Sequence, residues 1–86
     1  MNNKIIFQKE DLIGIILEDF DGKLNYCLRK DKPNIKLIDV LNEDKNQHET
    51  IIIKYINYLL NRFNQPDDLQ IRLYVINILY RMIYLF

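Results

Sequence analysis

The feature that most constrains the fold is the spacing of apolar residues in the second half of the chain. Between positions 49 and 63 the apolar residues recur with the 3.6-residue period of a helix, at Ile52, Ile53, Ile56, Leu59, Leu60 and Phe63. Residues 64–66 interrupt this pattern, and Pro66-Asp67-Asp68 is typical of a helix start, because carboxylates favour the positive end of the helix dipole. The sequence therefore predicts two helices, over 49–63 and from about 67 to near the C-terminus, packed antiparallel across a short loop.

The second of these helices has an apolar arc wider than one neighbouring helix can cover. Steps of about 100° per residue gather its polar and aromatic side chains into one stripe, formed by Gln70, Tyr74, Asn77, Arg81 and Tyr84. Apolar residues fill the rest of the circumference. We therefore expect this helix either to be central in the fold or to form a homodimer with a second chain.

The first half of the chain has features of strands and turns. Asp21-Gly22 matches a two-residue hairpin turn, which requires positive φ angles that these residue types tolerate. Pairing across that turn places Leu17 opposite Tyr26, Ile15 opposite Leu28 and Asp19 opposite Leu24. These pairs share one largely apolar face with Ile13. Residues 35–41 are interpreted as a third strand or a short turn of helix, and residues 5–7 as a short edge strand.

A helix over residues 10–20 is the competing interpretation. Leu12, Ile13, Ile16, Leu17 and Phe20 also share one helical stripe behind two acidic residues, but Gly14 and the many isoleucines favour a strand. The predicted fold class is α+β: a small antiparallel β-hairpin or three-stranded meander, packed on a C-terminal antiparallel helical hairpin. We expect residues 1–86 to form a single domain, with an all-α helical bundle as the alternative.

The composition excludes several kinds of chemistry. The chain of 86 residues has one cysteine, Cys27, and no serine, so it has no internal disulfide, no multi-cysteine zinc site and no serine nucleophile. The N-terminal residues lack the apolar stretch of a secretory signal, and Arg72 and Asn77 interrupt the apolar C-terminal run. We expect a cytoplasmic protein without a membrane span.

Three clusters that resemble catalytic or metal sites have simpler explanations. Cys27 and His48 are a conceivable thiol and base, but a packed cysteine and a histidine at a helix start are more ordinary. The carboxylates of Glu18, Asp19 and Asp21 lack the later ligand of a calcium loop and are interpreted as solvated turn residues. Residues 66–68 are explained by helix capping. The sequence therefore predicts a protein that is not an enzyme and that binds no cofactor or metal.

Charge and aromatic residues instead favour the binding of another protein. Between residues 23 and 36 there are five basic side chains and one acidic one, although the whole chain has 12 of each sign. Tyrosine and arginine are enriched at interface hot spots. The predicted partner-binding residues are Lys23, Arg29, Lys30, Tyr74, Asn77, Arg81 and Tyr84.

The small size and the many residues with AT-rich codons favour one kind of binding protein. We expect an inhibitor or immunity protein, of the type carried by phages and mobile elements, that blocks a toxin or a defence enzyme. A homo-oligomeric structural subunit is the alternative, and a nucleic-acid-binding protein that uses the basic segment is less favoured.

Overall fold

Most of the described residues of the chain are in helices. The computed structural model describes residues 8–22, 35–43 and 45–85. These contain α1 (Lys9–Asp21), α3 (Leu37–Glu43), the short 3₁₀ helix η1 (Lys45–Gln47), α4 (His48–Arg62) and α5 (Leu69–Leu85). No β-strand occurs in these three ranges, so the predicted α+β class is wrong and the alternative, an all-α bundle, is correct.

Helix α1 occupies the segment that was predicted to be the first strand of the hairpin. Its buried residues are Leu12, Ile16 and Phe20, which follow one another at intervals of about one helical turn. Glu10 and Asp11 lie in its first turn, where the helix dipole favours carboxylates. Burial of this stripe against the other helices outweighs the weak helix propensity of the isoleucines and of Gly14.

The Asp21-Gly22 pair ends α1 and does not form a hairpin turn. Gly22 has a φ of −87°, whereas the predicted turn needs a positive value. Its backbone N–H donates to the carbonyl oxygen of Glu18 at 2.7 Å, and a Cβ at this position would lie 2.7 Å from the same oxygen. Glycine therefore allows the chain to leave the helix close to its last turn. The predicted partner strand and the edge strand at 5–7 lie outside the described residues.

The segment 35–41 forms mainly helix α3 rather than a third strand. Leu37, Val40 and Leu41 are buried. His48, at the start of α4, is also buried, and its Nε2–H donates to the carbonyl oxygen of Leu41. This hydrogen bond ties the end of α3 to the beginning of α4. His48 therefore lies at a helix start, as expected, and is buried there.

Helices α4 and α5 confirm the predicted helical hairpin. Asn64 has a φ of 57°, in the left-handed region, and the N–H groups of Asn64 and Gln65 donate to the carbonyls of Asn61 and Leu60. This pattern is the Schellman motif that commonly ends a helix. The carboxylate of Asp68 then accepts a hydrogen bond from the N–H of Gln70 at 2.7 Å, which caps the start of α5.

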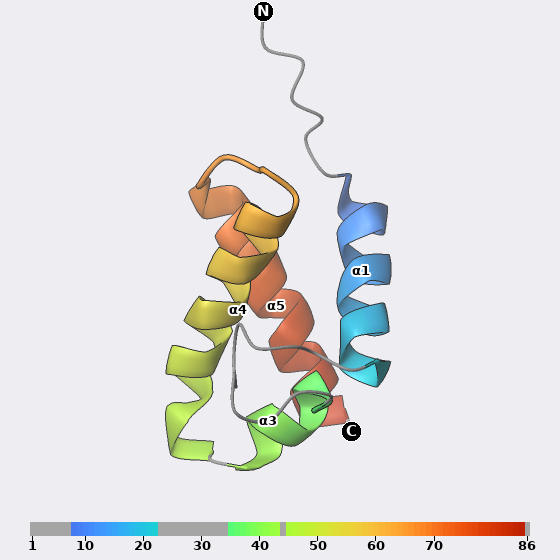
Figure 1. Ribbon diagram of the computed structural model, residues 1–86, viewed down its shortest axis with the longest axis vertical. Coiled ribbons are helices and arrows are strands. Elements are labelled where there is room, and N and C mark those ends of the chain that lie inside the picture. Colours follow the sequence, from blue (N-terminus) through green and yellow to red (C-terminus); the bar gives the residue numbers. More distant parts are fainter. Residues whose placement is uncertain (1–7, 23–34, 44, 86) are drawn as a thin grey trace, which may run out of the picture.

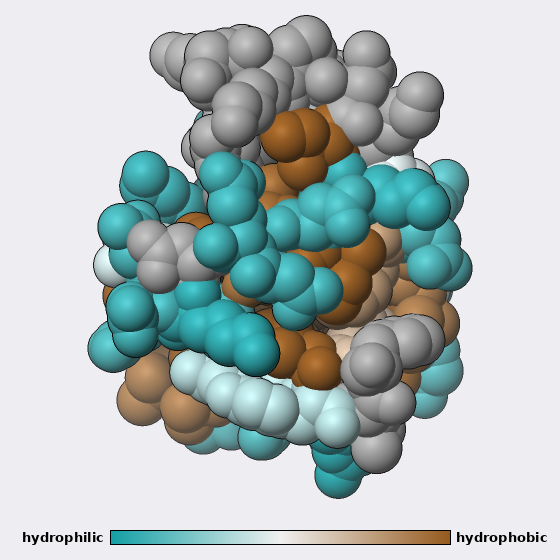
Figure 2. Space-filling model, turned by 90° about the horizontal axis from the view of Figure 1, so that it is seen from below, coloured by the Kyte–Doolittle hydropathy of each residue, from teal (hydrophilic) through white to brown (hydrophobic). Residues whose placement is uncertain are grey.

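Three long helices are arranged side by side, with α3 across one end (Figure 1). Helices α1 and α5 run in the same direction, and α4 runs in the opposite direction (Figure 1). Their buried side chains form one core, to which α4 contributes Ile52, Tyr55, Ile56, Leu59 and Leu60. Viewed from the end where α3 lies, apolar side chains are visible between polar ones (Figure 2). None of the helices in the described ranges is long and apolar enough to cross a membrane.

Candidate protein-binding surface

Helix α5 exposes a row of side chains along its whole length, which we call the α5 face. Its members are Leu69, Leu73, Asn77, Arg81 and Tyr84, all of them exposed. The three large apolar or aromatic side chains among them keep 67% (Leu69), 48% (Leu73) and 71% (Tyr84) of their surface open to solvent. The structure therefore brings together on one face Asn77, Arg81 and Tyr84, which the sequence had suggested as partner-binding residues.

A stacked pair of tyrosines lies at the C-terminal part of this face. The rings of Tyr80 and Tyr84 are nearly parallel, with an interplanar angle of 3° and centroids 5.8 Å apart. Tyr80 is half-buried against the core, whereas Tyr84 is largely exposed. Because Tyr80 supports one side of the Tyr84 ring, the exposed tyrosine is partly oriented before any partner binds, which reduces the entropy lost on binding.

A groove runs between α1 and α5 beside the α5 face. It has a volume of about 420 Å³ and is lined by Lys9 and Leu12 from α1 and by Gln70, Ile71, Leu73, Tyr74 and Asn77 from α5. Polar groups from Lys9, Gln70, Tyr74 and Asn77 surround apolar side chains. An apolar hollow with a few polar groups is the usual form of a site that accepts one side chain or a small ligand.

Tyr74, a fourth predicted binding residue, also holds the two helices together. Its hydroxyl donates to the main-chain oxygen of Lys9 at 3.4 Å, and the Lys9 ammonium lies 5.5 Å from the centre of its ring. A lysine over an aromatic ring is attracted by the electrons of the ring. Tyr74 is therefore half-buried in the wall of the groove and is less open to a partner than Tyr84.

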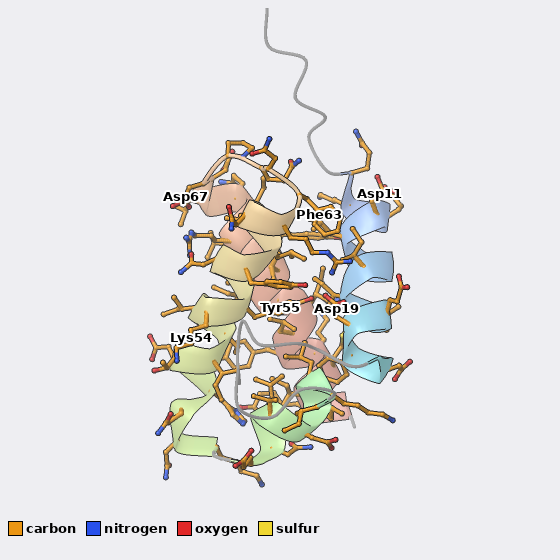
Figure 3. The ribbon with its side chains drawn as sticks, in the orientation of Figure 1. Asp11, Asp19, Lys54, Tyr55, Phe63 and Asp67 are labelled. Atoms are coloured by element: carbon orange, nitrogen blue, oxygen red, sulfur yellow. The ribbon has the colours of Figure 1, made fainter. Side chains whose placement is uncertain are left out.

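A hydrogen-bond cluster fixes the other side of α1 against α4. The buried hydroxyl of Tyr55 donates to Asp19 Oδ2 at 2.6 Å (Figure 3). The guanidinium of Arg62 lies 3.4 Å from Asp19 Oδ1. The carboxylate of Asp19 keeps only 12% of its surface exposed, so it is not the solvated turn residue that was expected. By holding α1 against α4, this cluster sets the position of the wall that α1 contributes to the groove.

The environment of Tyr55 predicts a loss of stability in alkali. Burial, and then the hydrogen bond to Asp19, raise the pKa of the Tyr55 phenol well above its ordinary value of 10.0. Above about pH 10 the unfolded chain releases this proton and the folded chain keeps it, so the unfolding free energy should fall by up to about 1.4 kcal/mol per pH unit. Urea denaturation at several pH values should show this fall in the parent and in Tyr84→Phe. A slope of the same size in Tyr55→Phe would contradict the assignment.

Other tyrosine and arginine side chains of α4 and α5 do not belong to this surface. Tyr55 is completely buried. Arg62 pairs with Asp19, and Arg72 pairs with Asp67 at 2.5 Å, so both arginines serve contacts within the chain. The remaining three predicted partner-binding residues, Lys23, Arg29 and Lys30, lie outside the described residues.

The clusters considered for catalysis or metal binding are not assembled in the described part of the chain. Those ranges contain no group of three or more His, Cys, Asp and Glu side chains that is able to hold a metal ion. His48 packs against α3, and Cys27 lies outside the described residues. Asp67 and Asp68 act at the start of α5, as the capping interpretation predicted.

The sequence reasoning missed the apolar members of the surface. Leu69 and Leu73 were placed beside the apolar arc of the last helix and not among the binding residues, although Leu73, Asn77 and Tyr84 follow one another at helical spacing on one side. Ile13 and Leu17 were assigned to a buried strand face, yet both are exposed on α1. The competing helical stripe over residues 10–20 also grouped Ile13 and Leu17 with the residues that are buried, so it did not predict their exposure.

The described residues form an all-helical bundle in which the α5 face lies beside the groove between α1 and α5. Comparison of the chain with models of protein families, with curated proteins and with solved structures found no match.

Proposed function

We propose that this protein acts by binding another protein through the α5 face and the adjoining groove. The observation that carries the proposal is the exposure of Leu69, Leu73 and Tyr84 along a single face of α5. Single exposed apolar side chains are common on soluble proteins, but a row of them beside a groove is typical of an interaction site.

The side chains of the α5 face are of the types that bind protein partners tightly and in a fixed orientation. Tyr84 offers a large, supported ring, and Arg81 offers several hydrogen-bond donors; these residue types dominate interface hot spots. The groove next to Leu73 has room for one large side chain of a partner. A partner would therefore bind both by apolar contact along the α5 face and by inserting one side chain into the groove.

Within this class, we favour an inhibitor or immunity protein that blocks a toxin or a defence enzyme. The support comes from the small size of the chain, its lack of serine, its single cysteine and histidine, and its segregated charges. Such a protein needs only one complementary surface, and segregated charge increases the rate of encounter with an oppositely charged target.

Capture of the partner by matched variants tests this proposal. The tagged parent chain and the tagged variant Leu73→Lys are each used to capture proteins from a host lysate. The variant should retain at least about tenfold less of a stoichiometric protein partner, because a charge replaces a central apolar contact. Ile53→Lys is the control, because Ile53 is similarly exposed (44%) but lies on α4. A partner lost equally with both variants, or with neither, would contradict the proposed surface.

Self-association is the second candidate, and the same exposed row on α5 favours it. Sedimentation equilibrium of the purified protein distinguishes the two functions. If the parent chain forms a dimer that Leu73→Lys converts to a monomer while Ile53→Lys does not, the α5 face joins two copies and the inhibitor proposal fails.

A further inference from the structure

Helix α1 presents an exposed face of its own next to the groove. We call this the α1 face; its members are Glu10, Ile13, Gly14, Leu17 and Asp21, which recur at intervals of about one helical turn. Ile13 and Leu17 keep 39% and 42% of their surface exposed. The buried residues Leu12, Ile16 and Phe20 form a separate stripe of α1.

Gly14 has no role in the packing of the described chain. A Cβ added at this position would have no heavy atom within 4 Å, so the space beside it is open. Gly14 lies in the interior of α1, where glycine is less stable than alanine because it loses more backbone entropy on folding. Contacts within the described ranges thus give no reason for glycine instead of alanine at position 14.

Two acidic residues at the C-terminal end of α1 also reduce the stability of the helix. Glu18 and Asp21 lie in its last turn, which contains no basic residue, and carboxylates there face the negative end of the helix dipole. Within the described ranges, no ion pair involves Glu10, Glu18 or Asp21. The apolar pair Ile13 and Leu17 is therefore bordered by negative charge that has no counterion in the described part of the chain.

We propose that the α1 face receives one helix of a protein partner, whose backbone lies close to α1 at Gly14 and whose apolar stripe is flanked by lysine or arginine. This proposal deepens, and rests on, the protein-binding function proposed above. Residues that lower the stability of their own helix are found mostly at functional sites. In α1, a glycine in the helix interior and two carboxylates in the last turn are such residues, and they lie beside exposed apolar side chains.

Each part of the proposal follows from one of these features. Ile13 and Leu17, one turn apart, match the side-chain spacing of a helix that docks on another helix or in a groove. Glycine lets two helix backbones approach closely, whereas a Cβ would hold them apart. The carboxylates attract a basic partner and disfavour an acidic one, including the α1 of a second copy.

Gly14→Ala tests the proposal because it should change stability and binding in opposite directions. The variant should melt about 4 to 8 °C higher than the parent, since alanine is the better helix former. Its affinity for the probe should nevertheless fall at least about tenfold. The probe is a synthetic amphipathic peptide with leucines on one helical face, flanked by lysines, used where it is monomeric. Thr50→Ala, at an exposed position of α4, is the control and should bind as the parent does.

A second peptide, with glutamates in place of the lysines, tests the charge. Calorimetry should show at least about tenfold tighter binding of the lysine peptide. Amide chemical shifts should change most at Ile13, Gly14 and Leu17. The combined change of Glu10→Gln and Asp21→Asn should remove the preference, whereas Glu49→Gln on α4 should leave it intact.

The outcomes separate this proposal from the proposed function. Equal binding of the two peptides, no loss of affinity in Gly14→Ala, or no binding of either peptide would overturn the inference about α1. The capture experiment on Leu73 would still decide the protein-binding function by itself. A dimer of the parent chain that Gly14→Ala dissociates would show a second copy at this face and would also overturn the inference.

Discussion

Replacing Ile16 with alanine is expected to lower the free energy of unfolding by about 2 to 5 kcal/mol. The Ile16 side chain is completely buried in the common core, so its removal leaves a cavity in addition to losing buried apolar surface. Such a loss is a large share of the stability of a domain this small. Urea denaturation followed by circular dichroism measures the change.

The neighbouring residue provides the control for this experiment. Leu17 is 42% exposed, so Leu17→Ala should cost less than about 1 kcal/mol. The hairpin predicted from the sequence would give the reverse order of losses, because it buries Leu17 and places Ile16 on the opposite face of the strand. A larger loss in Leu17→Ala than in Ile16→Ala would show that this segment is not the helix described above.

Asp19→Ala is expected to cost about 2 to 3 kcal/mol of stability. The substitution leaves the buried hydroxyl of Tyr55 without its acceptor, and an unsatisfied buried polar group costs about 1 to 3 kcal/mol. The contact with Arg62 adds little, because this arginine is 43% exposed. Thermal and urea unfolding of the variant measure the loss.

Glu18→Ala is the matched control, since Glu18 is the preceding residue of the same helix and is exposed. Its stability should remain within about 0.5 kcal/mol of the parent value. In the double variant Asp19→Ala, Tyr55→Phe, much of the loss should be recovered, because the unsatisfied hydroxyl is then absent. Additive losses in the double variant would contradict a direct bond between these two residues.

The sequence predicted the helical hairpin correctly because local and tertiary requirements agree there. The apolar residues of α4 have an unambiguous period, and Asn64 and Asp68 are residue types that end and start helices for known physical reasons. The boundaries followed from this local chemistry and needed no knowledge of the rest of the chain.

The prediction of the first half was wrong because two patterns were compatible with the same residues. Ile13, Ile15 and Leu17 alternate as in a strand, while Leu12, Ile16 and Phe20 repeat as in a helix. The choice between them depended on which side chains α4 and α5 could bury. Asp19 shows this most clearly, since its acceptor role requires Tyr55, which is 36 residues away. Such a contact has no local signal.

The candidate surface was predictable only in part, because it also depends on contacts between residues that are distant in the sequence. Asn77, Arg81 and Tyr84 emerged from the stripe on the last helix, and the structure places them together. The groove also needs Lys9 and Leu12, which contribute only when the early segment is a helix that lies beside α5. A binding surface shared by two distant segments therefore depends on the fold being correct.

The hydrogen bond between Tyr74 and Lys9 has a consequence for the living cell. It joins residues 65 positions apart, and the groove is built from the first and the last of the described helices. A ribosome releases the chain from its N-terminus onward, so a nascent chain cannot offer the groove until α5 has emerged. Recognition of a partner through this groove therefore requires a chain that includes α5, and a product truncated before α5 lacks the groove.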